Sequence, residues 1–175
     1  NETQMKIEEV SLLPYIEEAK ALSDVQVVYI HWGDEYNHLP NQSQKTIAKM
    51  LAQAGVDIVI GHHPHVIQSI EKIGNTLVFY SLGNYIFDQY FSTAVMEGLA
   101  LRLTRSEENL QISIMPHSSQ ESHAKPTLLV DEERTKALTE IAQYSDKNIA
   151  EMIKGGEVFT TLLLATSTEM AIINP

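Results

Sequence analysis

The chain has no cysteine, few basic residues and no long apolar run, and each absence removes a class of function. Without cysteine there are no disulfides and no thiolate chemistry, and the cellular compartment stays open. The 12 lysines and arginines stand singly against 23 acidic residues, and the net charge of -11 makes nucleic acid an unsuitable partner. No apolar stretch is long enough for a transmembrane helix, and no signal peptide is visible.

The remaining composition is that of an ordinary globular chain. Its 175 residues are close to the usual size of one domain, and 43% of them are hydrophobic and 20% charged. We therefore expect one domain or part of one. Because the chain opens with Asn1 rather than methionine, we also expect that further sequence precedes it.

Two apolar, β-branched runs, 27–33 and 56–65, end abruptly in histidine and glycine. The first ends at His31, and the second ends in the cluster His62, His63 and His65. Neutral imidazole is the commonest metal ligand in proteins, so the two strand ends favour a metal site. A single histidine at a strand end is more often a hydrogen-bonded residue of the surface or core, and for His31 alone that interpretation stays open. Three histidines within four residues are harder to explain in this way.

The segment between the two runs predicts a helix that Asn41 or Ser43 can cap and that Gly55 ends. A strand over 25–30, this helix and a strand over 57–60 form a βαβ unit. Its right-handed crossover makes the two strands parallel and near neighbours. Both histidine clusters then lie at the carboxyl edge of the sheet, which is where open α/β sheets bind ligands.

The rest of the chain predicts shorter elements. An amphipathic helix before the first strand should be kinked or divided by Pro14. Gly83 can permit a positive φ or a close approach of the backbone to a ligand. The other expected elements are a hairpin of 66–73 and 76–80, a second hairpin of 99–104 and 110–115, a helix over 131–144, and a stretch over 158–173 that is a strand or an ordered tail.

Three motifs in this order resemble the CapA family, also called PgsA: His31-Trp32-Gly33-Asp34-Glu35-Tyr36, Gly61-His62-His63-Pro64-His65, and Tyr80-Ser81-Leu82-Gly83-Asn84-Tyr85-Ile86-Phe87-Asp88. These are bacterial poly-gamma-glutamate capsule biosynthesis proteins with a calcineurin-like metallophosphatase fold. The resemblance implies an α/β fold, part of an αββα sandwich, with the βαβ unit followed by antiparallel hairpins. It implies that 1–125 is the carboxyl-terminal half of such a domain and that 126–175 is a helical, threonine-rich extension.

By this resemblance the metal ligands are His31, His63 and His65. His62 is assigned a catalytic role, facing the substrate or supporting a ligand. Asn84 is also assigned a catalytic role, in which it contacts substrate or orients a ligand histidine. A turn-forming asparagine after Gly83 is an equal alternative. The implied cofactor is manganese or zinc, with two ions if the upstream half is present. Trp32, Glu35 and Tyr36 line a cleft wall in one interpretation and clamp their loop by packing in another.

The function implied is poly-gamma-glutamate capsule biosynthesis, with metal-dependent hydrolysis of an anionic surface polymer as one form of it. Whether the chain is an enzyme stays open. A non-catalytic scaffold subunit of polymer synthesis and export is the main alternative, and a phosphoesterase is a third. The expected partners are the anionic polymer, the upstream half of the domain and other capsule-synthesis subunits. The expected location is the bacterial cell surface, with an anchor in a segment outside this chain.

Overall fold

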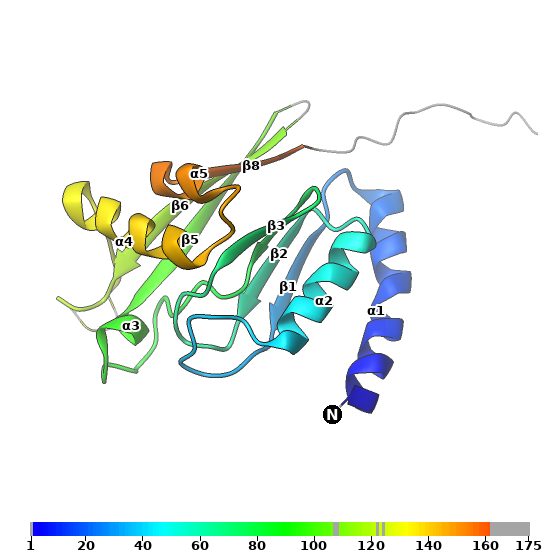
Figure 1. The fold of residues 1–175 in the computed structure, drawn as a ribbon, viewed down its shortest axis with the longest axis horizontal. Helices are drawn as coiled ribbons and strands as arrows, with labels where there is room; N and C mark the ends of the chain where they lie inside the picture. Colours follow the sequence, from blue (N-terminus) through cyan, green and yellow to red (C-terminus); the bar gives the residue numbers. More distant parts are fainter. Residues whose placement is uncertain (1, 107–108, 122, 124, 162–175) are drawn as a thin grey trace, which may run out of the picture.

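A computed structural model of the protein describes residues 2–106, 109–121, 123 and 125–161. Its elements, in chain order, are α1 (Glu2–Leu22), β1 (Val27–His31), α2 (Gln42–Gln53), β2 (Ile58–His62), β3 (Ile70–Ile73), β4 (Thr76–Phe79), α3 (Thr93–Met96), β5 (Glu97–Arg105), β6 (Asn109–Ser118), β7 (Thr127–Leu128), α4 (Asp131–Tyr144), α5 (Ala150–Gly155) and β8 (Glu157–Thr161). Figure 1 shows how they are arranged. None of the described helices is both long and apolar enough to cross a membrane.

The first sheet has the strand order β1-β2-β4-β3 and contains the predicted βαβ unit. Strands β1 and β2 are parallel, and their register places His31 directly opposite His62. Strand β4 continues the parallel arrangement, and β3 pairs with β4 as an antiparallel hairpin. The mixed α/β class, the parallel pair and the first hairpin are therefore confirmed.

Helices α1 and α2 cover one face of this sheet, as Figure 1 shows. Asn41 caps α2, since its side chain accepts from the Gln44 N–H while the Gln44 side chain accepts from the Asn41 N–H. The cluster beneath the helices is apolar and contains Ile16, Trp32, Ala48, Leu51, Val56, Val59, Val78 and Tyr80. Helix α1 is continuous with Pro14 inside it, so the expected division into two helices does not occur.

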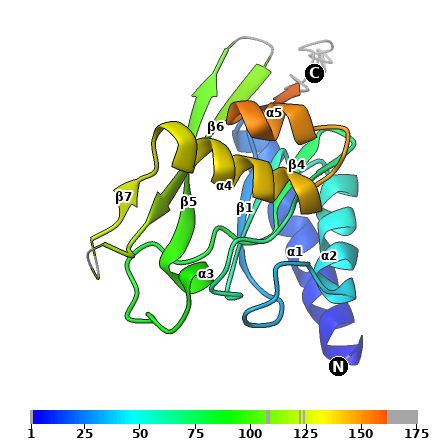
Figure 2. The same ribbon diagram turned by 60° about the vertical axis from the view of Figure 1, so that its left-hand side comes forward.

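The second sheet has the order β5-β6-β7, and β8 also pairs with β6. The predicted β5–β6 hairpin and the predicted helix over 131–144 are confirmed. Helices α4 and α5 pack against this sheet, as Figure 2 shows. The stretch over 158–173, expected as a strand or an ordered tail, forms β8 up to Thr161, and its remainder lies outside the described residues.

One apolar core joins the second sheet, helices α4 and α5, and the other face of the first sheet. Its fully buried members include Ile58, Leu77, Ile112, Leu138 and Ile153, which come from five different elements. Burial of such side chains stabilises a fold by about 1.5–3 kcal/mol each. Residues beyond 125 thus contribute to the same core as the two sheets, and the division of the chain at that point stays a prediction.

Candidate metal centre

The carboxyl ends of β1 and β2 bring the predicted histidines to one edge of the first sheet. The Trp32 N–H donates to the His62 carbonyl over 3.0 Å, which extends the parallel pairing by one residue. Beyond this point the Tyr36 N–H donates to the Pro64 carbonyl over 2.8 Å. The loop after β1 and the loop after β2 are therefore held against each other by backbone hydrogen bonds.

Glu35, His63 and His65 form a group whose possible ligand atoms all lie within 4.8 Å of one another. The Nε2 atom of His65 is 3.9 Å from a carboxylate oxygen of Glu35. Two imidazoles and a carboxylate are a donor set that suits zinc or manganese. Among the described residues this is the group of histidines and carboxylates that can hold a metal ion.

The structure thus joins two of the three predicted ligands and adds Glu35, for which the sequence left open a place on a cleft wall or in a loop clamped by packing. His31 lies next to the group without belonging to it, with its ring centroid 4.6 Å from that of His63. A carboxylate four residues after a candidate histidine, in a loop at the same sheet edge, is the signal that points to Glu35. The ligand roles of all these residues stay predictions.

The backbone at the group is strained. Tyr36, His63 and His65 have φ values of 62°, 99° and 60°, in the region that favours glycine. They are three of the four non-glycine residues with positive φ in the described part of the chain. Each such conformation costs on the order of 1–3 kcal/mol and persists where the surroundings enforce it, commonly at functional sites.

Asn84 is hydrogen-bonded to His65. Its Oδ1 atom lies 2.8 Å from His65 Nδ1, while its amide nitrogen donates to the Val95 carbonyl over 3.0 Å. Gly83 has a φ of +73°, which brings the chain round to Asn84 as the sequence suggested. Tyr36 stacks on His65 at 6.0 Å between centroids, and Phe87 lies 4.9 Å from it on another side. The His65 ring is therefore fixed by one hydrogen bond and two aromatic neighbours.

Two buried glutamines support the loop that carries Glu35. The Gln44 side chain donates to Gln68 Oε1 over 2.8 Å, and the Gln68 amide nitrogen donates to the Asn37 carbonyl over 2.8 Å. Gly33, with a φ of +88°, sits so close to the Gln44 side chain that a Cβ atom there would lie 2.6 Å from it. Helix α2 and the segment after His65 thus hold this loop from both ends.

His62, the second predicted catalytic residue, lies beside the group rather than in it. Its ring stacks on Tyr29 with a centroid distance of 3.9 Å, and its Nε2 atom is buried without a hydrogen-bond partner among the described residues. Burial, followed by the nearby His31, lowers the pKa of His62 below its usual value. The imidazole is therefore neutral at pH 7.

The histidines open into a cleft of about 540 Å³ between the first sheet and β5. One wall carries Tyr29 and Ile60, and the facing wall carries Leu99, Leu101 and Leu103. The arrangement combines an apolar trough with polar, metal-ligating groups at one end, which is typical of ligand sites.

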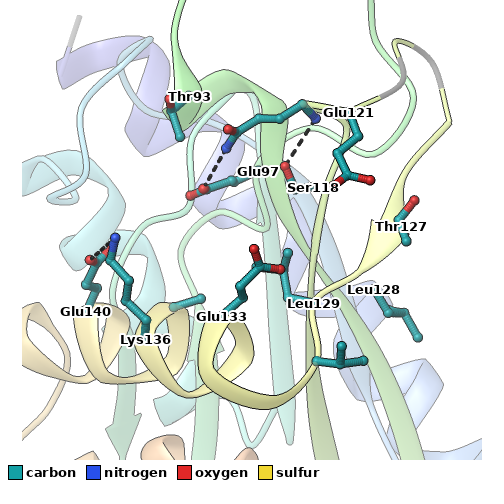
Figure 3. A pocket seen from close by; sticks show the side chains of 13 residues that line it. Thr93, Glu97, Ser118, Glu121, Thr127, Leu128, Leu129, Glu133, Lys136 and Glu140 are labelled. Carbon is teal, nitrogen blue, oxygen red and sulfur yellow. Dashed lines mark hydrogen bonds and ion pairs between the residues drawn. The ribbon is translucent and has the colours of Figure 1, made fainter.

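A second hollow of about 540 Å³ lies between α4 and the ends of β5, β6 and β7, and Figure 3 shows its lining. Two of its four carboxylates have partners, since Gln120 donates to Glu97 over 3.1 Å and Lys136 lies 4.0 Å from Glu140. Burial, and then Glu140, raise the pKa of Glu97. No residue singled out in the sequence lines this hollow, and we assign it no function.

The chain is similar in sequence to bacterial capsule synthesis proteins. Residues 1–89 of the 175 match the family described as bacterial capsule synthesis protein PGA_cap. The PGA biosynthesis protein CapA of Bacillus subtilis (strain 168) is 35% identical over 147 residues, which are 83% of this chain and 38% of the relative. The capsule biosynthesis protein CapA of Bacillus anthracis is 36% identical over 135 residues, 74% of this chain and 33% of the relative.

The chain therefore spans 38% and 33% of the length of these two relatives. The family match covers both strand ends with their histidines, the Glu35 loop and Asn84. These sequence matches show that the chain is a homologue of CapA and belongs to the bacterial capsule synthesis protein family PGA_cap.

Proposed function

We propose that the chain holds a divalent metal ion on Glu35, His63 and His65 and acts in poly-gamma-glutamate capsule biosynthesis as a metal-dependent hydrolase of an anionic surface polymer. The observation that carries the proposal is the convergence of three ligand atoms within 4.8 Å on a strained backbone. The capsule role is supported by the names of the Bacillus relatives. We place the protein at the bacterial cell surface, with an anchor outside this chain, alongside other capsule-synthesis subunits.

The site residues have distinct tasks in this proposal. A bound zinc or manganese ion supplies Lewis acidity and stabilises negative charge that develops during hydrolysis. Asn84 accepts from His65 Nδ1–H, which leaves His65 Nε2 free on the side of Glu35. His62 lines the cleft as a neutral imidazole, and in this proposal it faces the substrate or supports a ligand histidine.

Charge makes the metal necessary for such a substrate. The chain carries a net charge of -11, which repels a polyanion at long range. Glu35 adds a negative charge at the site itself. A divalent cation reverses the local sign, so polymer binding should depend on metal.

Elemental analysis of the purified chain after manganese or zinc loading tests the metal site. We expect about one ion per chain, and its loss when His63→Ala and His65→Ala are combined, since one remaining carboxylate cannot hold the ion. His123→Ala removes an exposed histidine stacked on Tyr90, away from the cleft, and is the matched control. Absence of metal from the parent protein would overturn the site and favour the scaffold alternative.

The hydrolase part needs its own assay. The metal-loaded chain, alone and with the remaining part of the Bacillus subtilis relative, is incubated with poly-gamma-glutamate, and polymer length is followed by size-exclusion chromatography. Shortening that the double variant lacks supports the proposal. Metal binding with cleavage of a simple phosphodiester instead of the polymer points to the phosphoesterase alternative.

A further inference from the structure

The segment 84–91, which follows β4, lies beside the candidate metal ligands. The Phe87 ring lies 4.9 Å from the His65 ring, and Phe91 packs edge-on against Tyr36 at 5.3 Å between ring centroids. Phe87 is 44% exposed and Phe91 is 65% exposed, so neither ring belongs to the apolar core. Their contacts instead join this segment to the two loops that carry the candidate ligands.

Gln89, within this segment, connects two residues that hold the His65 ring. Its Nε2 atom donates to the Tyr36 hydroxyl over 3.0 Å, and its Oε1 atom accepts from Asn84 Nδ2 over 3.4 Å. Tyr36 stacks on His65, and Asn84 Oδ1 lies 2.8 Å from His65 Nδ1. A side chain that only closed its own loop would need Asn84 alone, five residues away, whereas the bond to Tyr36 spans 53 residues of sequence.

The donors and acceptors along this series of hydrogen bonds fit together in one direction. The amide nitrogen of Asn84 has two hydrogens, one donated to the Val95 carbonyl over 3.0 Å and the other to Gln89. Because both are in use, the amide oxygen stays toward His65 and accepts the proton on Nδ1. Gln89 then presents its oxygen to Asn84 and its nitrogen to Tyr36, whose hydroxyl oxygen can accept. The series therefore favours the tautomer that leaves His65 Nε2 unprotonated.

The Tyr36 end of the connection reaches Glu35. Tyr36 has a φ of 62°, and its N–H donates to the Pro64 carbonyl of the histidine loop over 2.8 Å. Glu35 immediately precedes Tyr36 in the chain. A Tyr36 ring held by Gln89 therefore also limits the positions open to the Glu35 backbone.

We propose that Gln89 is a positioning residue of the metal site. It fixes the Asn84 amide and the Tyr36 ring, and it thereby sets the orientation and the tautomer of the His65 ring. The inference rests on the proposed function, because it concerns the ion held by the group of three ligands. Partners outside a ligand set commonly change metal affinity by about 10–100-fold. Because Gln89 acts through Asn84 and Tyr36, we expect the lower end of that range.

Two-dimensional NMR of the imidazole nitrogens in the metal-free chain tests the tautomer. At alkaline pH, where imidazoles are neutral, His65 of the parent should carry its proton on Nδ1. Gln89→Met keeps the length of the side chain and removes both hydrogen bonds, so a measurable fraction of His65 should carry the proton on Nε2. Gln89→Glu should restore the parent tautomer, because a carboxylate accepts from Asn84 Nδ2 and from the Tyr36 hydroxyl. A parent tautomer in Gln89→Met would overturn the proposal.

Isothermal titration with zinc tests the effect on the ion. Gln89→Met should bind zinc about tenfold more weakly than the parent, and Gln89→Glu should regain the parent affinity. Gln53→Met replaces an exposed glutamine of α2 and should match the parent. Full affinity in Gln89→Met would overturn the proposal and leave the metal site intact, whereas a parent chain that binds no zinc would overturn the metal site and this inference with it.

Discussion

The amide oxygen of Asn84 and the Nδ1 atom of His65 are joined by a hydrogen bond of 2.8 Å. The amide nitrogen of Asn84 donates to the Val95 carbonyl, which can only accept, so the oxygen must face the imidazole. His65 therefore carries its proton on Nδ1 and presents the Nε2 lone pair toward Glu35.

Asn84→Ala should weaken zinc binding by about 10–100-fold, since the ring loses the partner that fixes its tautomer and orientation. Asn84→Asp keeps an acceptor at the same place and should retain most of the affinity. Isothermal titration with zinc measures both. Asn148→Ala, at an exposed position, is the control, and equal affinities for Asn84→Ala and the parent would contradict the orienting role.

His31 and His63 offer a direct comparison of a neighbour with a ligand. Because His31 lies outside the group of three, His31→Ala should reduce zinc affinity by less than about tenfold. His63→Ala removes a donor, Glu35→Gln removes the negative charge of one, and each should reduce zinc affinity by more than about a hundredfold. The reverse order in the same titration would restore His31 as a ligand.

Gly61 is required by packing in β2. A Cβ atom at this position would collide with the Tyr80 carbonyl and with Trp32 Nε1, which are themselves hydrogen-bonded at 2.8 Å. Gly61→Ala should therefore lower the free energy of unfolding by about 3 kcal/mol or more, measured by urea denaturation. Gly155→Ala is the control, because nothing lies within 4 Å of its Cβ position, and it should be neutral or slightly stabilising.

His117 should make the fold sensitive to acid. It is 1% exposed, both ring nitrogens lack partners among the described residues, and Tyr85 packs edge-on against it at 4.9 Å. Burial lowers the pKa of His117 from 6.5 to about 4. Between these values the unfolded chain binds the proton and the folded chain does not, so stability falls as pH falls, by about 3 kcal/mol at the lower end.

His117→Leu should remove this component. The difference in the free energy of unfolding between pH 7 and pH 4.5 should shrink by about 2 kcal/mol, whatever the variant's stability at pH 7. His123→Leu changes an exposed histidine and should leave the difference unaltered. An unchanged pH dependence in His117→Leu would show that another group is responsible.

The parts of the fold that follow from local chemistry could be predicted from the sequence. The strands ending at His31 and His62 are apolar and β-branched, and Asn41 and Gly55 mark the ends of the helix between them. Parallel pairing follows from the crossover rule. Helix α5 could not be predicted in the same way, because its six residues are too few to show an apolar period.

The site was less predictable because it depends on loops. Glu35 has no sequence period to reveal it, and its place beside His65 is set by the Tyr36–Pro64 hydrogen bond between two separate loops. The positive φ of His63 and His65 is equally hidden, since glycine is the usual marker of that conformation. Pro14 does not divide α1, because a proline within a helix removes only one hydrogen bond and the helix continues past it.

The paired side chains of Gln44 and Gln68 have a consequence for the thermodynamics of ion uptake. Since they order the Glu35 loop when the chain folds, little conformational entropy is left to be lost when an ion arrives. Uptake should then leave the hydrodynamic radius and the circular dichroism spectrum unchanged and raise the melting temperature through mass action alone. In such measurements the histidine edge should accordingly behave as a preorganised site.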